Sequence, residues 1–201
     1  MTAGELIAAC VLDAAIGDPR GWPHPVRWMG WVIAQYERRI QTLVQGATGK
    51  RVAGLLLAVG LPLLVYGVVT VVIAVSARVD AWAGTAATVL LAFWSLAARD
   101  LHDHARAVAQ ALTRGSLEEA REAVARIVGR ETRDLDEEGV VRAAVETVAE
   151  STADGYVAPL FYLVVGGPPL ALAYKAVNTL DSMVGHRTPR YEQIGWASAR
   201  L

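Results

Sequence analysis

Two long stretches without charged side chains dominate the hydrophobic pattern of the chain. Residues 52–77 contain no Asp, Glu, Lys or Arg, and as a helix these 26 residues would extend roughly 39 Å. This is enough to cross a hydrocarbon core of about 30 Å, so the stretch predicts a transmembrane helix. Residues 81–98 form a second such stretch, with Trp82 and Trp94 near its ends, as is typical of interfacial aromatics. The short link between the stretches predicts a helical hairpin. A buried hairpin of a soluble protein is the alternative, although charge-free helices of this length are rare there.

A third apolar stretch, residues 156–174, is interrupted by Gly-Gly-Pro-Pro at 166–169. Proline lacks an N–H donor and clashes with the preceding turn, so a regular helix cannot continue through this tetrapeptide. The pattern predicts two short helices and a re-entrant or broken helix near 156–174. The N-terminal apolar stretch, residues 6–16, is short and contains Asp13. It lacks the basic start of a secretory signal, so we expect a half-helix that dips into the membrane face.

Residues 100–150 are polar and have helical periodicity. Ser116 and Glu119 form a capping-box pattern that predicts a helix to about residue 128. Residues 136–149 predict another helix, with an apolar stripe at Val141, Ala144, Val145 and Val148. Residues 17–51 contain six basic and two acidic residues, so the positive-inside rule places 17–51 and 100–150 in the cytoplasm. We therefore expect an all-α, polytopic integral membrane protein with a helical cytoplasmic segment and a single membrane domain over residues 1–201.

Composition supports a membrane protein and excludes several functions. Of the 201 residues, 54% are hydrophobic and 19% are charged, whereas soluble domains average about 25% charged residues. The net charge of −1 gives no basic face for nucleic acid. The single cysteine, Cys10, cannot form an internal disulfide or a cysteine metal site by itself. The sequence contains no P-loop, no dinucleotide-binding glycine pattern and no nucleophile-elbow motif.

Three acidic residues follow one another at intervals of four: Glu146, Glu150 and Asp154. On one helix they would share a face and would repel one another unless a cation lay between them. Mg²⁺ is a candidate, because it prefers carboxylate and phosphate oxygens. An exposed acidic ridge with one salt bridge is the alternative interpretation.

A second polar group follows the broken apolar stretch. Lys175, Asn178 and Asp181, together with Ser182, share one helical face. An ammonium directly after an apolar run is a candidate functional group, although a lysine can also extend to the lipid headgroups.

The third group is Asp18, His24 and Arg27. Proline on both sides of His24 forces an extended, rigid backbone, which would fix His24 and Arg27 for gripping a phosphate or carboxylate. A turn between two helices is the alternative.

Four sequence blocks resemble one family in the same order. They are residues 12–30 (LD, GDP and PHPVR), 127–136 (IVGRET and LD), 144–161 (AVETVAESTADG and APLF) and 174–200 (YKAVNTLDSMVG, RY and GWASAR). Together they resemble adenosylcobinamide-phosphate synthase, the membrane-bound CobD/CbiB family of cobalamin biosynthesis. Glu131 and Ser151 replace the usual Asp and Asn of the family. Family members usually continue with further hydrophobic segments, so the chain is expected to lack the C-terminal portion of the family.

The resemblance implies ATP-dependent amide formation between a propionate carboxylate of adenosylcobyric acid and aminopropanol or its phosphate. It implies a multi-pass protein of the cell inner membrane whose active site faces the cytoplasm. We expect a role for Mg²⁺ with ATP as co-substrate, and a homo-oligomer or other corrinoid-pathway enzymes are possible partners. The expected metal ligands are Glu146, Glu150 and Asp154, and the expected catalytic residues are Lys175, Asn178 and Asp181. The expected substrate-binding residues are Asp18, His24, Arg27 and Arg130.

One geometric expectation follows from these assignments. Asp154 precedes the third apolar stretch and Lys175 follows it, so a shared site requires the chain to dip and return at 166–169. Lys175 would then be accessible from the cytoplasm. A transporter module and a non-catalytic scaffold of the corrinoid pathway are the rival functions. The uncharged stretches 52–77 and 81–98 disfavour a transporter, which usually places ionisable groups within its spans.

Overall fold

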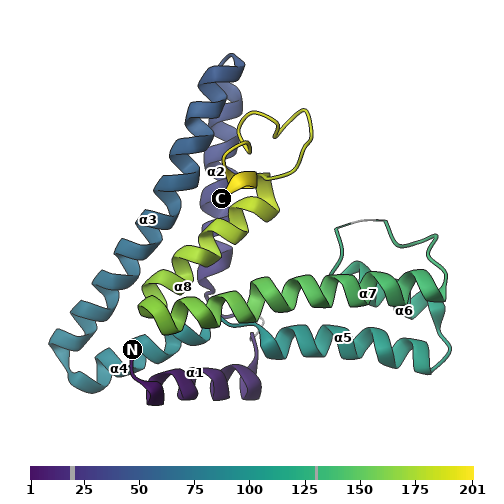
Figure 1. The fold of residues 1–201 in the computed structure, drawn as a ribbon, viewed down its shortest axis with the longest axis horizontal. Helices are drawn as coiled ribbons and strands as arrows, with labels where there is room; N and C mark the ends of the chain where they lie inside the picture. Colours follow the sequence, from purple (N-terminus) through teal and green to yellow (C-terminus); the bar gives the residue numbers. More distant parts are fainter. Residues whose placement is uncertain (19–20, 130) are drawn as a thin grey trace.

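The computed structural model describes residues 1–18, 21–129 and 131–201, and these residues contain helices and no strands (Figure 1). The α-helices are α1 (Ala3–Ile16), α2 (Pro25–Leu43), α3 (Ala47–Val79), α4 (Ala81–Phe93), α5 (Ala98–Thr113), α6 (Leu117–Ala125), α7 (Glu137–Thr152) and α8 (Ala158–Val184). A π-helical turn, Ala153–Val157, joins α7 to α8, and a 3-10 turn, Ser198–Arg200, lies near the C-terminus. Three stretches are long and apolar enough to cross a membrane: Ala47–Val79, Ala81–Thr113 and Glu137–Val184. The all-helical, multi-pass membrane fold is therefore confirmed.

The first two apolar stretches form helices with bounds that differ from the predicted ones. Helix α3 begins at Ala47 and has 33 residues, about 50 Å of helix, with Pro62 inside it. Helix α4 ends at Phe93, earlier than the predicted residue 98, and its 13 residues extend only about 20 Å. Asp80 begins α4 by accepting hydrogen bonds from the backbone N–H groups of Trp82 and Ala83, at 2.8 and 3.3 Å. Figure 1 shows the chain turning sharply at the lower end of α3, from which α4 turns back, and α3 and α4 are in contact.

The third apolar stretch is broken where the sequence predicts it. Gly167 has φ 68° and ψ −166°, a conformation that suits glycine and ends the first limb of α8. Pro168 and Pro169 then begin the second limb. In Figure 1 the chain runs from α7 through the π-helical turn into α8, reverses direction, and returns toward α2. The reversal brings Asp154 into hydrogen-bonding contact with Asn178, so the predicted broken, re-entrant helix is confirmed.

Three apolar cores hold these helices together. The largest packs α2, α3 and α8 through buried side chains that include Ile33, Leu57, Leu61, Leu172 and Leu180. Another packs α1 and α4 against the first limb of α8 around Ala9, Phe93 and Leu163. Between helices that span a membrane, van der Waals packing rather than transfer out of water drives association, and these contacts fix the second limb of α8 beside α2.

The polar segment has a core of its own between α5, α6 and α7. Ser116 caps α6, as predicted, by accepting a hydrogen bond from the N–H of Glu119, and Asp136 caps α7 by accepting one from the N–H of Gly139. The predicted apolar stripe of α7 is wrong in part. Val140 and Ala143 are the buried residues, whereas Val141 and Val145 are 43% and 63% exposed. The buried face is displaced because α7 packs on both α5 and α6.

Candidate functional site

The π-helical turn and the second limb of α8 meet at Asp154. The Oδ2 atom of Asp154 accepts a hydrogen bond from Asn178 Nδ2 at 3.1 Å, and Oδ1 accepts one from the Tyr174 hydroxyl at 3.3 Å. Tyr174 and Asn178 are four residues apart, so they lie on one face of the helix. The chain reversal at Gly167 therefore joins two of the sequence blocks, and each carboxylate oxygen of Asp154 receives a donor.

Lys175 lies beside this group with its charge largely uncompensated. Its side chain interacts electrostatically with Asp154 and with His24, yet the ammonium has no hydrogen bond or ion pair within the described residues. The residue is half-buried. An ammonium in this setting loses hydration without gaining a direct partner, which makes it available to an anionic ligand.

His24 begins α2 and is oriented by the backbone. Its Nδ1 accepts the N–H of Val26 at 3.2 Å, which leaves Nε2 to carry the proton of the neutral ring. Burial lowers the pKa of His24, and the charges of Arg27 and Lys175 lower it further, while Asp18 and Asp100 raise it. His24 is therefore a neutral N–H donor at neutral pH, and its charged neighbours include Lys175 of α8.

The other predicted N-terminal residues surround His24 more loosely. Arg27 Nη2 lies 3.8 Å from the Asp18 carboxylate, and these side chains are 55% and 35% exposed. An exposed pair at this distance contributes little to stability, so both groups are free to bind a ligand. Arg130, the fourth predicted substrate-binding residue, lies outside the described residues.

The three predicted metal ligands do not form a closed site. Glu146 and Glu150 are exposed on α7, whereas Asp154 faces Asn178. Among the described residues, no three His, Cys, Asp or Glu side chains lie close enough together to hold a metal ion. The assignment of Mg²⁺ to these carboxylates stays a prediction.

Asp181 lies one turn beyond Asn178 and borders two cavities. The smaller cavity, about 190 Å³, is lined by Tyr174, Asn178 and Asp181 together with residues of the C-terminal turn. The larger cavity, about 690 Å³, lies between Asp181 and the segment that follows α8. Asp181 thus separates the Asp154 group from a larger polar cavity.

A tryptophan-lined cavity lies next to His24 and Arg27. Four of the six tryptophans of the chain, Trp22, Trp28, Trp31 and Trp94, line a volume of about 760 Å³. The Trp94 Nε1 atom is buried and has no hydrogen-bond acceptor in the part of the chain that the structure describes. The cavity therefore offers a broad aromatic surface.

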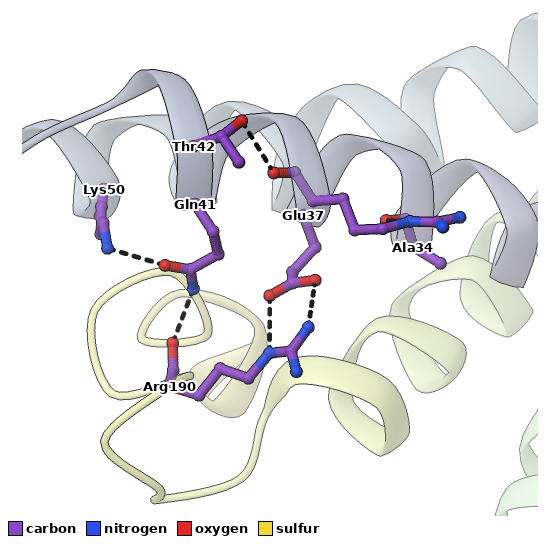
Figure 2. A network of polar contacts seen from close by, with 7 residues as sticks. Ala34, Glu37, Gln41, Thr42, Lys50 and Arg190 are labelled. Atoms are coloured by element: carbon purple, nitrogen blue, oxygen red, sulfur yellow. Dashed lines mark hydrogen bonds and ion pairs between the residues drawn. The ribbon is translucent and has the colours of Figure 1, made fainter.

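Two buried acidic residues hold helices and loops together, and the sequence did not reveal this role. Asp13 of α1 is 2% exposed and accepts the N–H of Ala98 at 2.9 Å, so it caps α5 from another helix. Burial raises the pKa of Asp13, and the hydrogen bonds from Ala98 and Arg99 oppose this shift. Glu37 of α2 is 4% exposed and binds Arg190 through two hydrogen bonds of 2.9 Å (Figure 2). Asp13 could have been recognised from the sequence, because it is an acidic residue within an apolar stretch. The Glu37 pair could not, because its partner Arg190 lies 153 residues further along the chain.

Comparison with known proteins gives the family. A family model described as CobD/Cbib protein matches residues 6–201. Two similar proteins are named "Cobalamin biosynthesis protein CobD". The one from Yersinia enterocolitica is 46% identical over 205 residues, covering 100% of this chain and 63% of the relative. The one from Geobacter metallireducens is 49% identical over 198 residues, covering 97% of this chain and 60% of the relative.

A Salmonella typhi protein named "Cobalamin biosynthesis protein CbiB" is 45% identical over 193 residues, covering 96% of this chain and 60% of the relative. The chain thus spans less than two thirds of the length of these relatives. No solved structure matches it. The family model covers all four sequence blocks, and the fold brings the last two of them together. This chain therefore belongs to the CobD/CbiB family.

Proposed function

We propose that the protein functions in cobalamin biosynthesis as an ATP-dependent acid–amine ligase. The reaction joins a propionate carboxylate of adenosylcobyric acid to the amine of aminopropanol or of its phosphate. The names of the relatives support the pathway, and the family's resemblance supports the reaction.

One observation carries the proposal. Lys175, a half-buried ammonium with no direct partner in the described residues, interacts electrostatically with both Asp154 and the imidazole of His24. An amide ligase must hold an unreactive carboxylate while it is activated and must stabilise the anion that develops. A cation and a neutral N–H donor, held on two different helices, suit that task.

The proposed chemistry proceeds through an acyl phosphate. The substrate carboxylate attacks the terminal phosphorus of ATP, ADP leaves, and the amine then displaces inorganic phosphate to form the amide. The catalytic groups position these reactants and neutralise their charge, as in other phosphoryl transfers. We assign Lys175 to the carboxylate and phosphoryl oxygens, and Asn178 to orienting Asp154. We assign Asp181 to accepting the proton that the attacking ammonium must lose.

Mg²⁺ would neutralise charge on the ATP phosphates. A metal that arrives with a nucleotide needs only one or two protein carboxylates, because phosphates and water supply its other ligands. Asp154 is the predicted ligand that lies within the candidate site, with Glu150 one turn and Glu146 two turns earlier. Both oxygens of Asp154 already accept hydrogen bonds, so a metal ligated by Asp154 would use the remaining lone pairs of the carboxylate.

The tryptophan-lined cavity suits the corrinoid. A corrinoid presents a broad apolar ring surrounded by polar side chains. The four tryptophans match such a ring, and His24 and Arg27 at the edge match its side chains. With the candidate site in the cytoplasm, ATP reaches it directly, and a cysteine at position 175 should react with reagents from that side.

Amide formation in isolated membranes tests the proposal. The chain is expressed in the full length of its reading frame in a host that lacks cobinamide synthesis, and adenosylcobyric acid, ATP, Mg²⁺ and each amine are supplied. We expect Lys175→Met and Asp181→Asn to lose at least tenfold in rate. Arg114→Ala is the matched control, because Arg114 is an exposed cation at the end of α5 whose side chain has no hydrogen bond or ion pair in the described part. Full activity in both site variants would favour a scaffold instead.

A further inference from the structure

The segment that follows α8 folds against α2 and α3 as a fixed loop. Residues 185–197 are held by the Arg190–Glu37 pair, and the Arg190 carbonyl also accepts a hydrogen bond from Gln41 Nε2 at 2.8 Å (Figure 2). Lys50 of α3 in turn donates to Gln41 Oε1 at 2.7 Å. The loop is therefore attached to α2 through its own backbone and through Arg190, and Lys50 of α3 holds the Gln41 side chain in place.

Close backbone packing fixes the same loop further. Arg51 Nε donates to Gln193 Oε1 at 2.6 Å. A Cβ atom at Gly54 would overlap the carbonyl of Ile194, and Ile194 itself is fully buried. Because backbone meets backbone at this point, the loop can keep one conformation before any ligand arrives.

The loop, the end of α8 and Arg51 enclose the cavity of about 690 Å³. The residues that line it include Arg51, Arg187, Arg200 and His186. Arg187 has no hydrogen bond or ion pair in the described part of the chain. Arg51 uses only Nε in the bonds described, and Arg200 uses Nη1, which donates to the Trp196 carbonyl at 2.9 Å. Several guanidinium N–H groups therefore remain for a ligand.

We infer that this cavity is a binding site for a phosphate group. A guanidinium group can donate two parallel hydrogen bonds to the oxygens of a phosphate, and three arginines line this cavity. The volume lies within the range of about 300–1,000 Å³ that is typical of small-molecule sites. Two acidic residues, Asp181 and Glu192, also line the cavity, so it is not a uniformly cationic surface for a polymer.

The position of the cavity indicates how the ligand lies. Asp181 lines both this cavity and the smaller one that contains Tyr174 and Asn178. A phosphate on the three arginines directs the rest of the molecule toward Asp181 and then toward the Asp154 group. In this respect the inference rests on the proposed function, since ATP and a phosphorylated amine are the two substrates that could supply the phosphate.

Direct binding tests the site without an activity assay. Purified protein in phosphatidylcholine nanodiscs is titrated by calorimetry with inorganic pyrophosphate, ATP and the phosphorylated amine in separate arms, with free aminopropanol as the unphosphorylated control. We expect the double variant Arg187→Ala/Arg200→Ala to weaken binding of the phosphate ligands at least tenfold, while Arg114→Ala leaves it unchanged. Thermal unfolding of each variant shows whether the fold is intact.

The outcomes separate this inference from the proposed function. Phosphate binding that depends on Arg187 and Arg200, in a protein without ligase activity, supports the site and rejects the reaction. Equal affinity in a folded double variant and the parent protein overturns the site, whatever the ligase assay shows. The ligand that competes most strongly with pyrophosphate identifies which substrate supplies the phosphate.

Discussion

Replacing Asn178 with leucine tests the contact that closes the re-entrant hairpin. Leucine has nearly the shape of asparagine, so the variant removes the donor to Asp154 without opening a large cavity. The Asp154 carboxylate then keeps only the Tyr174 hydroxyl, 3.3 Å away, as a donor among the hydrogen bonds of the described residues. The polar connection between the π-helical turn and the second limb of α8 then depends on Tyr174 alone.

The expected cost follows from the charge on the acceptor. A hydrogen bond to a charged group contributes about 1.5–3 kcal/mol, more than the roughly 1 kcal/mol of a neutral pair. For a chain of this size each kcal/mol lowers Tm by about 2–4 °C, so Asn178→Leu should lower Tm by about 3–12 °C. Asp154→Asn preserves a neutral hydrogen bond and should cost less.

Thermal unfolding in detergent, followed by circular dichroism, measures these shifts. The double variant Asp154→Asn/Asn178→Leu completes a thermodynamic cycle, and its loss should be smaller than the sum of the two single losses. A decrease in Tm of less than about 1 °C for Asn178→Leu, or strict additivity in the cycle, would refute the argument that this hydrogen bond joins the limbs.

Three further predictions concern buried ionisable groups. Because burial raises the folded-state pKa of Asp13, the stability of the protein should fall as pH rises above about 4 and the carboxyl ionises. Asp13→Asn keeps an acceptor for the Ala98 N–H and should flatten the plot of Tm against pH, and an unchanged slope would contradict this. Because the pKa of His24 is lowered, its imidazole should stay neutral down to below about pH 6.5, as NMR titration would show; protonation at or above that pH argues against its burial beside Lys175. Arg190→Met leaves Glu37 buried without its partner, so it should lower Tm more than the double variant Glu37→Leu/Arg190→Met does. A larger decrease in Tm for the double variant would show that the ion pair itself stabilises the loop.

The re-entrant hairpin was predictable because its cause is local. Two prolines after two glycines cannot continue a helix, and the helical spacing of Lys175 and Asn178 places them on neighbouring faces after the reversal. The contact between Asp154 and Asn178 then follows from chain geometry. The caps at Ser116 and Asp136 were predictable for the same reason, since each cap bonds within three residues.

The features that the sequence did not reveal depend on partners far along the chain. Helix α4 ends at Phe93 although the charge-free stretch continues to residue 98. Helix α5 starts at Ala98, whose N–H is bound by Asp13 from a helix 85 residues earlier. The Arg190–Glu37 pair likewise links residues 153 positions apart. Hydrophobic periodicity carries no information about such pairings, because they arise only when the helices pack.

The π-helical turn at Ala153–Val157 determines which way the following helix faces. The N–H of Ala158 bonds to the carbonyl of Ala153, five residues back, so this turn contains one residue more than an α-helical turn. Deleting one residue there would restore the ordinary i+4 pairing and rotate every later position by about 100° about the helix axis. The first limb of α8 would then present different side chains to α1 and α4. Chain length at this turn is therefore under tighter constraint than side-chain identity at exposed positions such as Ala153.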